Sequence, residues 1–140
     1  MSNENKGKVD FASAAWIDIT RRELEALVAV HGKPGVQFGF CEIFTDAPSH
    51  ISASGEVAWY FRTNGKSVEV AAGTLKGADV TITTDYAGVL PQARQYYTPE
   101  ILAERAKEPP GAAFDSVQGD LSLVPDYLVE LHNRLAVITA

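Results

Sequence analysis

The alternation of apolar and polar residues is clearest just beyond the middle of the chain. Val80, Ile82 and Thr84 alternate with polar neighbours, and β-branched residues at a period of two predict a half-buried strand. The apolar spacing then changes to three and four residues, which is typical of a helix. Asp85 stands at the change, where its carboxylate can accept hydrogen bonds from the first N–H groups of that helix. We therefore expect a strand that turns directly into a helix, kinked or shortened by Pro91, within a sheet that carries helices on one face.

Three earlier segments also have strand patterns. Val57–Thr63 and Lys66–Ala72 flank Asn64-Gly65, and this arrangement predicts a β-hairpin closed by a type I′ turn. Val36–Thr45 is largely apolar on both faces, which predicts a central strand or one that faces a cavity. Together with the strand before Asp85, these segments predict one mainly antiparallel sheet.

Helical spacing predicts the remaining elements. The first helix covers Phe11–Val30, with Thr20 as a possible cap of a second segment, and Gly32 is expected to end it in a left-handed conformation. Glu100–Lys107 is expected to form a short helix. Val124–Ile138 has the apolar stripe of an amphipathic final helix.

Length and composition indicate a single domain with its own core. The chain has 140 residues, of which 46% are apolar, so a core can form without metals or disulfides. Residues 1–10 are polar and are expected to form a flexible N-terminal segment, while residues 11–140 form the domain. The segment Asp46–Gly55 is expected to be a loop, long enough to act as a lid.

The charge balance and the cysteine content exclude several classes of protein. A net charge of -6 and a pI of about 5.0 argue against nucleic acid and anionic membrane surfaces as partners. Cys41 is the only cysteine, so an intramolecular disulfide and a cysteine metal cluster are excluded. Without an apolar signal core or a spanning segment, we expect a cytoplasmic protein that does not insert into a membrane.

Two short segments carry a resemblance to a known family. Ala-Asp-Val-Thr-Ile-Thr-Thr-Asp at 78–85 and Val-Gln-Gly-Asp-Leu at 117–121 resemble the sterol carrier protein 2 family of lipid-binding domains. The resemblance covers roughly residues 16–138. It implies an α+β fold with a mainly antiparallel sheet of about five strands, covered by helices on one face. It also implies an apolar tunnel for a lipid, sterol or acyl chain between the two layers.

Polar residues that could carry chemistry are few. Asp46 and His50, with Glu42 just before them, offer donors for a metal or acid–base site. An ordinary surface loop explains them better, because the paired-histidine spacing of a metal site is absent. Asp85 with Tyr86 could form a carboxylate–phenol pair, although a helix cap explains Asp85 better. No nucleophile elbow, phosphate-binding glycine loop or zinc motif is present, and we expect neither a metal nor a cofactor.

The remaining single residues have ordinary structural explanations. His31 is expected to lie at a helix end, and His132 is expected to be partly buried in the final helix. Cys41 is expected to be a buried, unreactive thiol, because its neighbour is anionic. Arg62, on the hairpin, could bind a ligand carboxylate or simply be solvated at a strand end.

Aromatic and leucine side chains are more informative, because a cavity needs apolar walls with a few polar groups. The residues that we expect to contact a ligand are Phe38, Phe40, Trp59, Phe61, Tyr86, Leu90, Leu128, Leu131 and Leu135.

The sequence therefore predicts a carrier or accessory protein that binds a lipid, acyl chain, sterol or aromatic compound in an apolar cavity. The alternative is a small cofactor-free enzyme that acts on a hydrophobic carbonyl or aromatic substrate, with Asp46, His50, Asp85 and Tyr86 as candidates. A pure interaction module, with a solid core, is a third class. Whether the protein forms a homodimer is left open by the sequence. Either the final helix or the loop Asp46–Gly55 is expected to gate the cavity.

Overall fold

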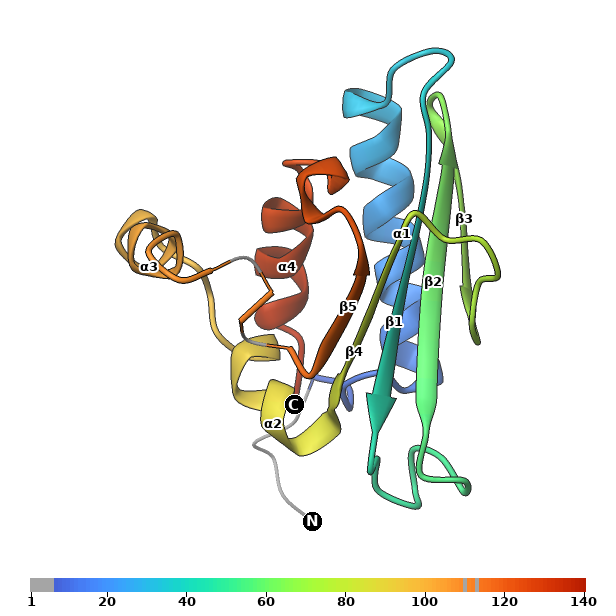
Figure 1. Cartoon of the computed structure of the whole chain (residues 1–140). Helices are drawn as coiled ribbons and strands as arrows, with labels where there is room; N and C mark the ends of the chain where they lie inside the picture. Colours follow the sequence, from blue (N-terminus) through green and yellow to red (C-terminus); the bar gives the residue numbers. More distant parts are fainter. Residues whose placement is uncertain (1–6, 110, 113) are drawn as a thin grey trace.

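The fold is an α+β layer structure built on one mixed five-stranded sheet (Figure 1). The computed structural model of the chain describes residues 7–109, 111–112 and 114–140. The strands lie in the order β3-β2-β1-β4-β5. Their bounds are β1 Gln37–Thr45, β2 Val57–Asn64, β3 Ser67–Ala72, β4 Val80–Asp85 and β5 Ser116–Gly119.

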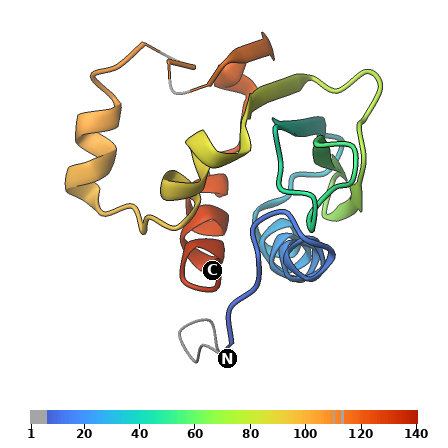
Figure 2. The ribbon, with the colours of Figure 1, turned by 90° about the horizontal axis from the view of Figure 1, so that it is seen from below.

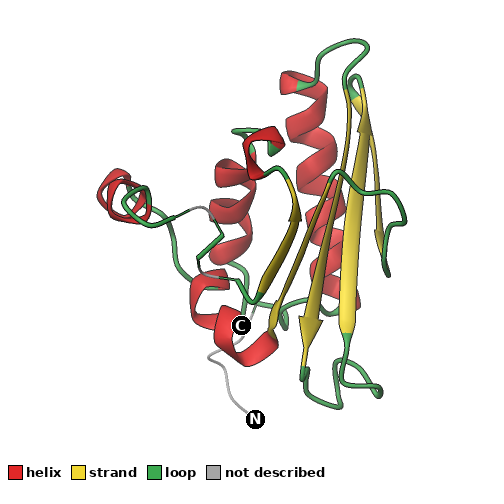
Figure 3. Ribbon diagram, viewed as in Figure 1, coloured by secondary structure: helices red, strands yellow, loops and turns green. Residues whose placement is uncertain are grey.

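The helices cover one face of this sheet, as the sequence predicted (Figure 2 and Figure 3). α1 and α4 lie side by side against the sheet, whereas α3 stands away from the body of the molecule (Figure 2). A 3-10 turn, η1, precedes α4. The bounds are α1 Ala14–His31, α2 Tyr86–Ala93, α3 Pro99–Arg105, η1 Leu121–Leu123 and α4 Leu128–Ala136.

Strand β1 is the central strand, which the apolar pattern on both of its faces predicted. It pairs antiparallel with β2, where Phe40 lies opposite Phe61, and parallel with β4, where Phe40 lies opposite Val80. The β2–β3 and β4–β5 pairings are antiparallel. The sheet is thus mainly antiparallel with one parallel pairing.

The strand-to-helix switch at Asp85 is confirmed. Asp85 ends β4 and its Oδ2 accepts a hydrogen bond from the Gly88 N–H at 2.8 Å, which caps α2. Pro91 lies inside α2, which is only eight residues long. The short helix is consistent with a proline that cannot donate to the backbone ladder.

The predicted hairpin forms, but its turn is not type I′. Asn64 is still paired with Ser67, so the two loop residues are Gly65 and Lys66. Gly65 has φ 61, and Asn64 is not among the residues with positive φ. Positive φ at the first loop position alone is the pattern of a type II′ turn, which glycine in that position favours. The prediction placed the turn one residue too early.

The first helix differs from prediction at two positions. Thr20 does not cap a second segment, because α1 is continuous and the Thr20 hydroxyl donates to the Trp16 carbonyl oxygen at 2.8 Å. Gly32 ends the helix in an extended conformation, with φ -61 and ψ 145, and not in a left-handed one. A Cβ on Gly32 would collide with the backbone carbonyl of Gly65, so glycine is required there for close approach of the hairpin.

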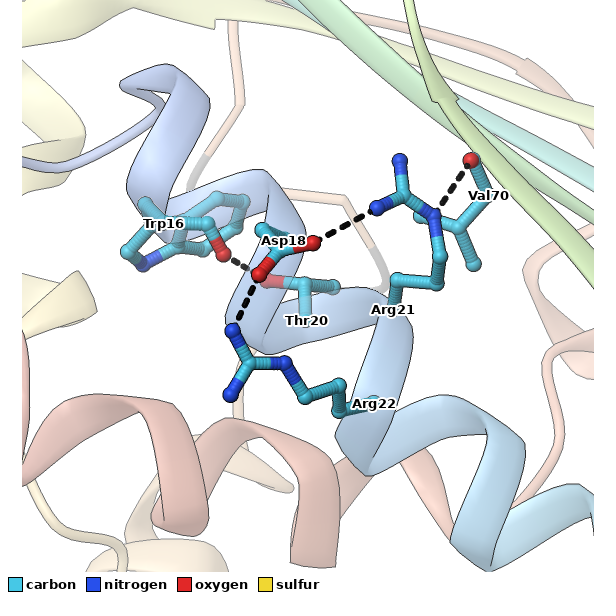
Figure 4. A network of polar contacts seen from close by, with 6 residues as sticks. All are labelled: Trp16, Asp18, Thr20, Arg21, Arg22 and Val70. Carbon is cyan, nitrogen blue, oxygen red and sulfur yellow. Dashed lines mark hydrogen bonds and ion pairs between the residues drawn. The ribbon is translucent and has the colours of Figure 1, made fainter.

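Polar contacts on α1 fasten it to the edge strand β3 (Figure 4). Arg21 donates from Nε to the Val70 carbonyl oxygen at 3.2 Å, and its Nη1 pairs with Asp18 at 2.8 Å. Asp18 also pairs with Arg22 one turn further along. The guanidinium of Arg21 therefore uses an unpaired carbonyl at the sheet edge that would otherwise face solvent.

The C-terminal part contains one strand that the sequence analysis missed and a shorter helix than it predicted. β5 has four residues, of which only Val117 is even partly buried, so no alternating pattern reveals it. The predicted helix Val124–Ile138 is helical only from Leu128, because the chain before it forms η1 and a turn at Pro125.

Contacts between the two ends of the described chain hold α4 in place. Val9 forms a parallel bridge with Thr139, and the Val9 N–H donates to the Ile138 carbonyl oxygen at 2.8 Å. Arg134 on α4 pairs with Glu23 on α1 at 2.9 Å. Of the segment 1–10 that was expected to be flexible, residues 1–6 lie outside the described residues.

Candidate functional site

A pocket of about 390 Å³ lies between the helical face of the sheet and the helices. Its floor comes from β1, β2 and β4, and its walls come mainly from α1, α2 and α4. The floor residues are Phe40, Glu42, Trp59 and Ile82. The apolar walls include Trp16, Val89, Leu128, Leu131 and Leu135, and the polar lining consists of Gln92, Tyr97, Arg105 and His132.

Strand alternation explains why the floor is formed by these side chains. Phe40 and Glu42 are two residues apart on β1 and therefore point to the same face. The lateral neighbours of Glu42 are Trp59 on β2 and Ile82 on β4, in register on either side. A single acidic side chain thus stands in a row of aromatic and aliphatic groups.

Glu42 is the acidic residue of the pocket lining. Its Oε1 accepts a hydrogen bond from the Trp59 indole Nε1–H at 2.9 Å. Among the described residues Oε2 has no hydrogen-bond partner and is not fully buried, and the half-buried Glu42 side chain lines the pocket. Removal from water raises the pKa of Glu42 to about 7, although the Trp59 hydrogen bond works in the opposite direction. Near neutral pH the side chain therefore exists in both protonation states.

The polar side of the pocket is an aromatic stack joined to α4. The rings of Tyr97 and His132 lie parallel with centroids 3.8 Å apart, and the Arg105 guanidinium carbon lies 4.9 Å from the Tyr97 centroid. Asn133 holds the backbone of Tyr97 by two hydrogen bonds, accepting from its N–H at 2.7 Å and donating to its carbonyl oxygen at 3.1 Å. The loop between α2 and α3 is therefore attached to α4 at the edge of the pocket.

Burial also changes the acidity of this stack. It raises the pKa of the Tyr97 phenol and lowers the pKa of His132, whose Nε2 lies 2.6 Å from the Gln95 carbonyl oxygen. His132 is thus a partly buried histidine with a backbone partner, as predicted.

Five of the nine predicted ligand-contact residues line the pocket: Phe40, Trp59, Leu128, Leu131 and Leu135. The other four lie elsewhere. Phe61 is fully buried in the core, and Phe38 borders separate hollows. The Tyr86 hydroxyl donates to the Phe11 carbonyl oxygen at 2.6 Å, and Leu90 packs partly buried against the core. Contact with a ligand stays a prediction for all nine.

The candidates for an acid–base or metal site do not come together. Asp46 and His50 lie in the loop after β1, where His50 is 3.7 Å from Asp10, and neither lines the pocket. Asp85 is occupied as the cap of α2. Within residues 7–109, 111–112 and 114–140, no group of three or more His, Cys, Asp or Glu side chains is arranged to hold a metal ion.

The other single residues have structural roles. His31 is the last residue of α1 and stacks on Tyr127, with ring centroids 5.8 Å apart. Cys41 is buried, as predicted, and burial raises the pKa of its thiol. Arg62 pairs with Glu69 at 2.6 Å and does not line the apolar pocket, so it is not placed to bind a carboxylate there.

Glu42 was predicted only as a neighbour of Asp46 and His50, and Gln92 and Arg105 were not predicted to lie at the site. For Glu42 a signal existed, since one acid interrupts the apolar face of a strand predicted to be central. For Gln92 and Arg105 no signal existed, because their place depends on how α2 and α3 fold over the sheet. None of the helices in the described part of the chain has the length and apolarity that crossing a membrane requires.

Comparison with known proteins finds no matching family model and no matching curated protein. Among solved structures, the chain is similar to one described as "UbiJ-SCP2 Ubiquinone synthesis protein". The two are 17% identical, with a TM-score of 0.43, over 86% of this chain and 85% of the other. SCP2 in that description is the sterol carrier protein 2 family that the sequence motifs resemble.

Proposed function

We propose that this protein binds a hydrophobic or amphipathic small molecule between its sheet and its helices and acts as a carrier or accessory protein. The observation that carries the proposal is the pocket of about 390 Å³, walled by aromatic and aliphatic side chains with a few polar groups. Small-molecule sites have this composition and start at roughly 300 Å³. An interaction module with a solid core would have no use for such a space.

The walls provide the driving force for binding. Each apolar group that a ligand removes from water contributes roughly 25 cal/mol per Å² of buried surface. Trp16, Phe40, Trp59 and Leu131 are nearly fully buried in the fold and face the pocket, so they form a wall that does not have to be ordered on binding. The pocket is thus preorganised for an apolar body.

Intrinsic fluorescence tests this proposal directly. The chain has two tryptophans, Trp16 and Trp59, and both line the pocket. A ligand that enters it should change the emission of both in a saturable way. Native mass spectrometry of freshly purified protein should show a co-purifying molecule, and titration with acyl chains, sterols and aromatic compounds should identify the class.

Replacing either of two alanines on α2 by phenylalanine gives a matched pair of variants for this experiment. Ala93 lines the pocket, whereas Ala87 on the same helix is exposed. Ala93→Phe should block the space and abolish saturable binding, and Ala87→Phe should leave it unchanged. If no member of the three ligand classes binds the wild type, or if both variants bind equally well, the proposal is wrong.

One observation favours a second function, that of a cofactor-free enzyme. Glu42 is a carboxyl with a pKa of about 7 inside an apolar pocket, which is the environment of many catalytic acids and bases. As a carboxylate it would take a proton from the carbon next to a ligand carbonyl and return a proton to that carbon, so no other reactant is consumed.

Hydrogen exchange into a bound ketone separates the two functions. In D₂O an enzyme of this kind would replace the hydrogens next to the carbonyl with deuterium, and Glu42→Gln would stop the exchange without stopping binding. A carrier would bind the ketone and leave those hydrogens in place.

A further inference from the structure

We propose that Glu42 makes the pocket selective for apolar ligands that carry an acceptor oxygen, a ketone or aldehyde carbonyl above all, to which its carboxyl donates a hydrogen bond. The inference deepens the proposed binding function and rests on it. It names the chemical group that the ligand presents at the floor of the pocket.

The Trp59 indole determines which oxygen of Glu42 remains available. An indole N–H is a donor only, so the oxygen that it contacts, Oε1 at 2.9 Å, must act as an acceptor. In the neutral carboxyl the proton therefore belongs on Oε2. That oxygen has no partner among the described residues, and its side chain lines the pocket. The neutral form thus presents one unused O–H donor to whatever occupies the space.

The surroundings make this donor selective. On the floor of the pocket, the Glu42 side chain lies between Trp59 and Ile82 on the two neighbouring strands. Phe40 precedes it on the same face of β1. None of these three side chains offers an acceptor. A hydrocarbon that fills the pocket would exclude water from Oε2 and leave the donor unsatisfied, which is costly in an apolar site. A carbonyl oxygen satisfies it, whereas a ligand carboxylate at this position would place a second acid beside Glu42.

The other ionisable groups of the pocket do not compete near neutral pH. Tyr97, before α3, titrates above its ordinary value of 10, and His132, on α4, titrates below 6.5. Arg105, on α3, contributes a guanidinium to the lining. Cys41 lies next to Glu42 in sequence and titrates above 9. Glu42, whose pKa is about 7, is therefore the ionisable group of the pocket whose charge changes near neutral pH.

A set of naphthalenes with the same ring and different substituents tests the inference. The probes are acetylnaphthalene, ethylnaphthalene, naphthylmethylamine and naphthoate, each substituted at the same ring position and measured by equilibrium dialysis. We expect acetylnaphthalene to bind about three- to tenfold more tightly than ethylnaphthalene below pH 7, since one hydrogen bond distinguishes them. Its affinity should fall as pH rises through the pKa of the carboxyl and level off near that of ethylnaphthalene, a total loss of about three- to tenfold, because the carboxylate cannot donate.

Two substitutions at position 42 complete the test. Glu42→Gln keeps a donor beside an acceptor, so it should retain the preference for the ketone and lose the pH dependence. Glu42→Leu should bind both neutral probes equally. The wild-type pH series does not depend on the folding of either variant.

The opposite outcomes are equally distinct. Equal binding of acetylnaphthalene and ethylnaphthalene at every pH, or binding of the amine or of naphthoate that is tighter than that of acetylnaphthalene below pH 7, would overturn the inference while leaving the binding function intact. If Ala93→Phe abolishes the binding of none of the probes, the proposed function itself fails, whatever effect the substitutions at Glu42 have.

Discussion

Trp16 and Thr139 share a buried hydrogen bond although 123 positions separate them, with the indole Nε1–H donating to Oγ1 at 3.2 Å. The Thr139 hydroxyl in turn donates to the Leu135 carbonyl oxygen at 2.7 Å. One hydroxyl therefore connects α1, which supplies a pocket wall, to the end of α4, which supplies another.

The first prediction concerns this hydroxyl. Thr139→Val keeps the shape of the side chain but leaves the Trp16 N–H buried without an acceptor, which should cost about 1–3 kcal/mol in the free energy of unfolding. Urea denaturation measures the loss. Thr139→Ser, which keeps the hydroxyl, should lose clearly less, and equal losses for the two variants would show that the hydrogen bond is unimportant.

The second prediction is that the stability of the wild type falls as pH rises through the range in which Glu42 titrates. Its pKa in the folded protein is about 7, above the ordinary value of 4.5, so between these values the folded state holds a proton that the unfolded state has released. The free energy of unfolding is thus highest below about pH 4.5 as far as Glu42 is concerned, and decreases by roughly 3 kcal/mol by about pH 7 and above.

The contribution of Glu42 is obtained from the difference between wild type and Glu42→Gln, because other groups titrate in the same range. His132, whose pKa is lowered, destabilises the fold as pH falls below 6.5 in both proteins. The difference in unfolding free energy should shift in favour of the glutamine variant as pH rises from about 5 to about 8. A constant difference would mean that the carboxyl is not desolvated.

The third prediction is that Gly32 tolerates no side chain. A methyl group there meets the Gly65 carbonyl and the Cα of Lys66, both of which are backbone and can move only if the hairpin moves. Gly32→Ala should therefore cost about 1–3 kcal/mol. Gly88→Ala is the control, since its nearest neighbour is the Asp85 side chain at 3.3 Å and alanine favours the helix. A Gly32→Ala variant as stable as the control would contradict the prediction.

The fourth prediction concerns entry into the pocket. Leu131 is buried but has the pocket on one side, so Leu131→Ala should cost about 2–3 kcal/mol, at the lower end for leucine, and should speed ligand release. Leu24→Ala, in α1 and fully buried outside the pocket lining, should cost at least as much without changing release. Equal effects on release would exclude α4 as a gate.

Hydrogen exchange locates the gate. No described residue of the loop Asp46–Gly55 lines the pocket, whereas α3 has no buried residue and contributes Arg105 to the lining. We expect a bound ligand to protect amides in α3 and α4 and to leave the loop unchanged. Protection confined to Asp46–Gly55 would favour the loop.

The sequence was most predictive where local chemistry alone decides the conformation. Asp85 caps its helix and the hairpin strands pair because both depend on neighbouring residues. The turn at Gly65, by contrast, depends on how far the ladder extends, and Gly32 depends on a hairpin that approaches from elsewhere in the chain.

The same division holds within the candidate site. Apolar residues at helical or strand spacing predicted part of the lining, including Trp59 and Leu131. The raised pKa of Glu42 was not predictable, because three strands and a layer of helices together exclude water from its carboxyl group. An isolated acid in an apolar strand was visible, but its partner Trp59 is 17 residues away.

The pairing of Val9 with Thr139 has a consequence for the synthesis of the protein. As the chain leaves the ribosome, β1, β2, β3 and β4 are all available before any residue of α4 exists. The floor residues Phe40, Trp59 and Ile82 then have no helix from the C-terminal part above them, and domains generally fold as units. Until residue 139 has left the ribosome, the nascent sheet exposes the aromatic surface that later becomes the pocket floor. Chaperone binding and aggregation therefore compete most strongly with folding during this interval.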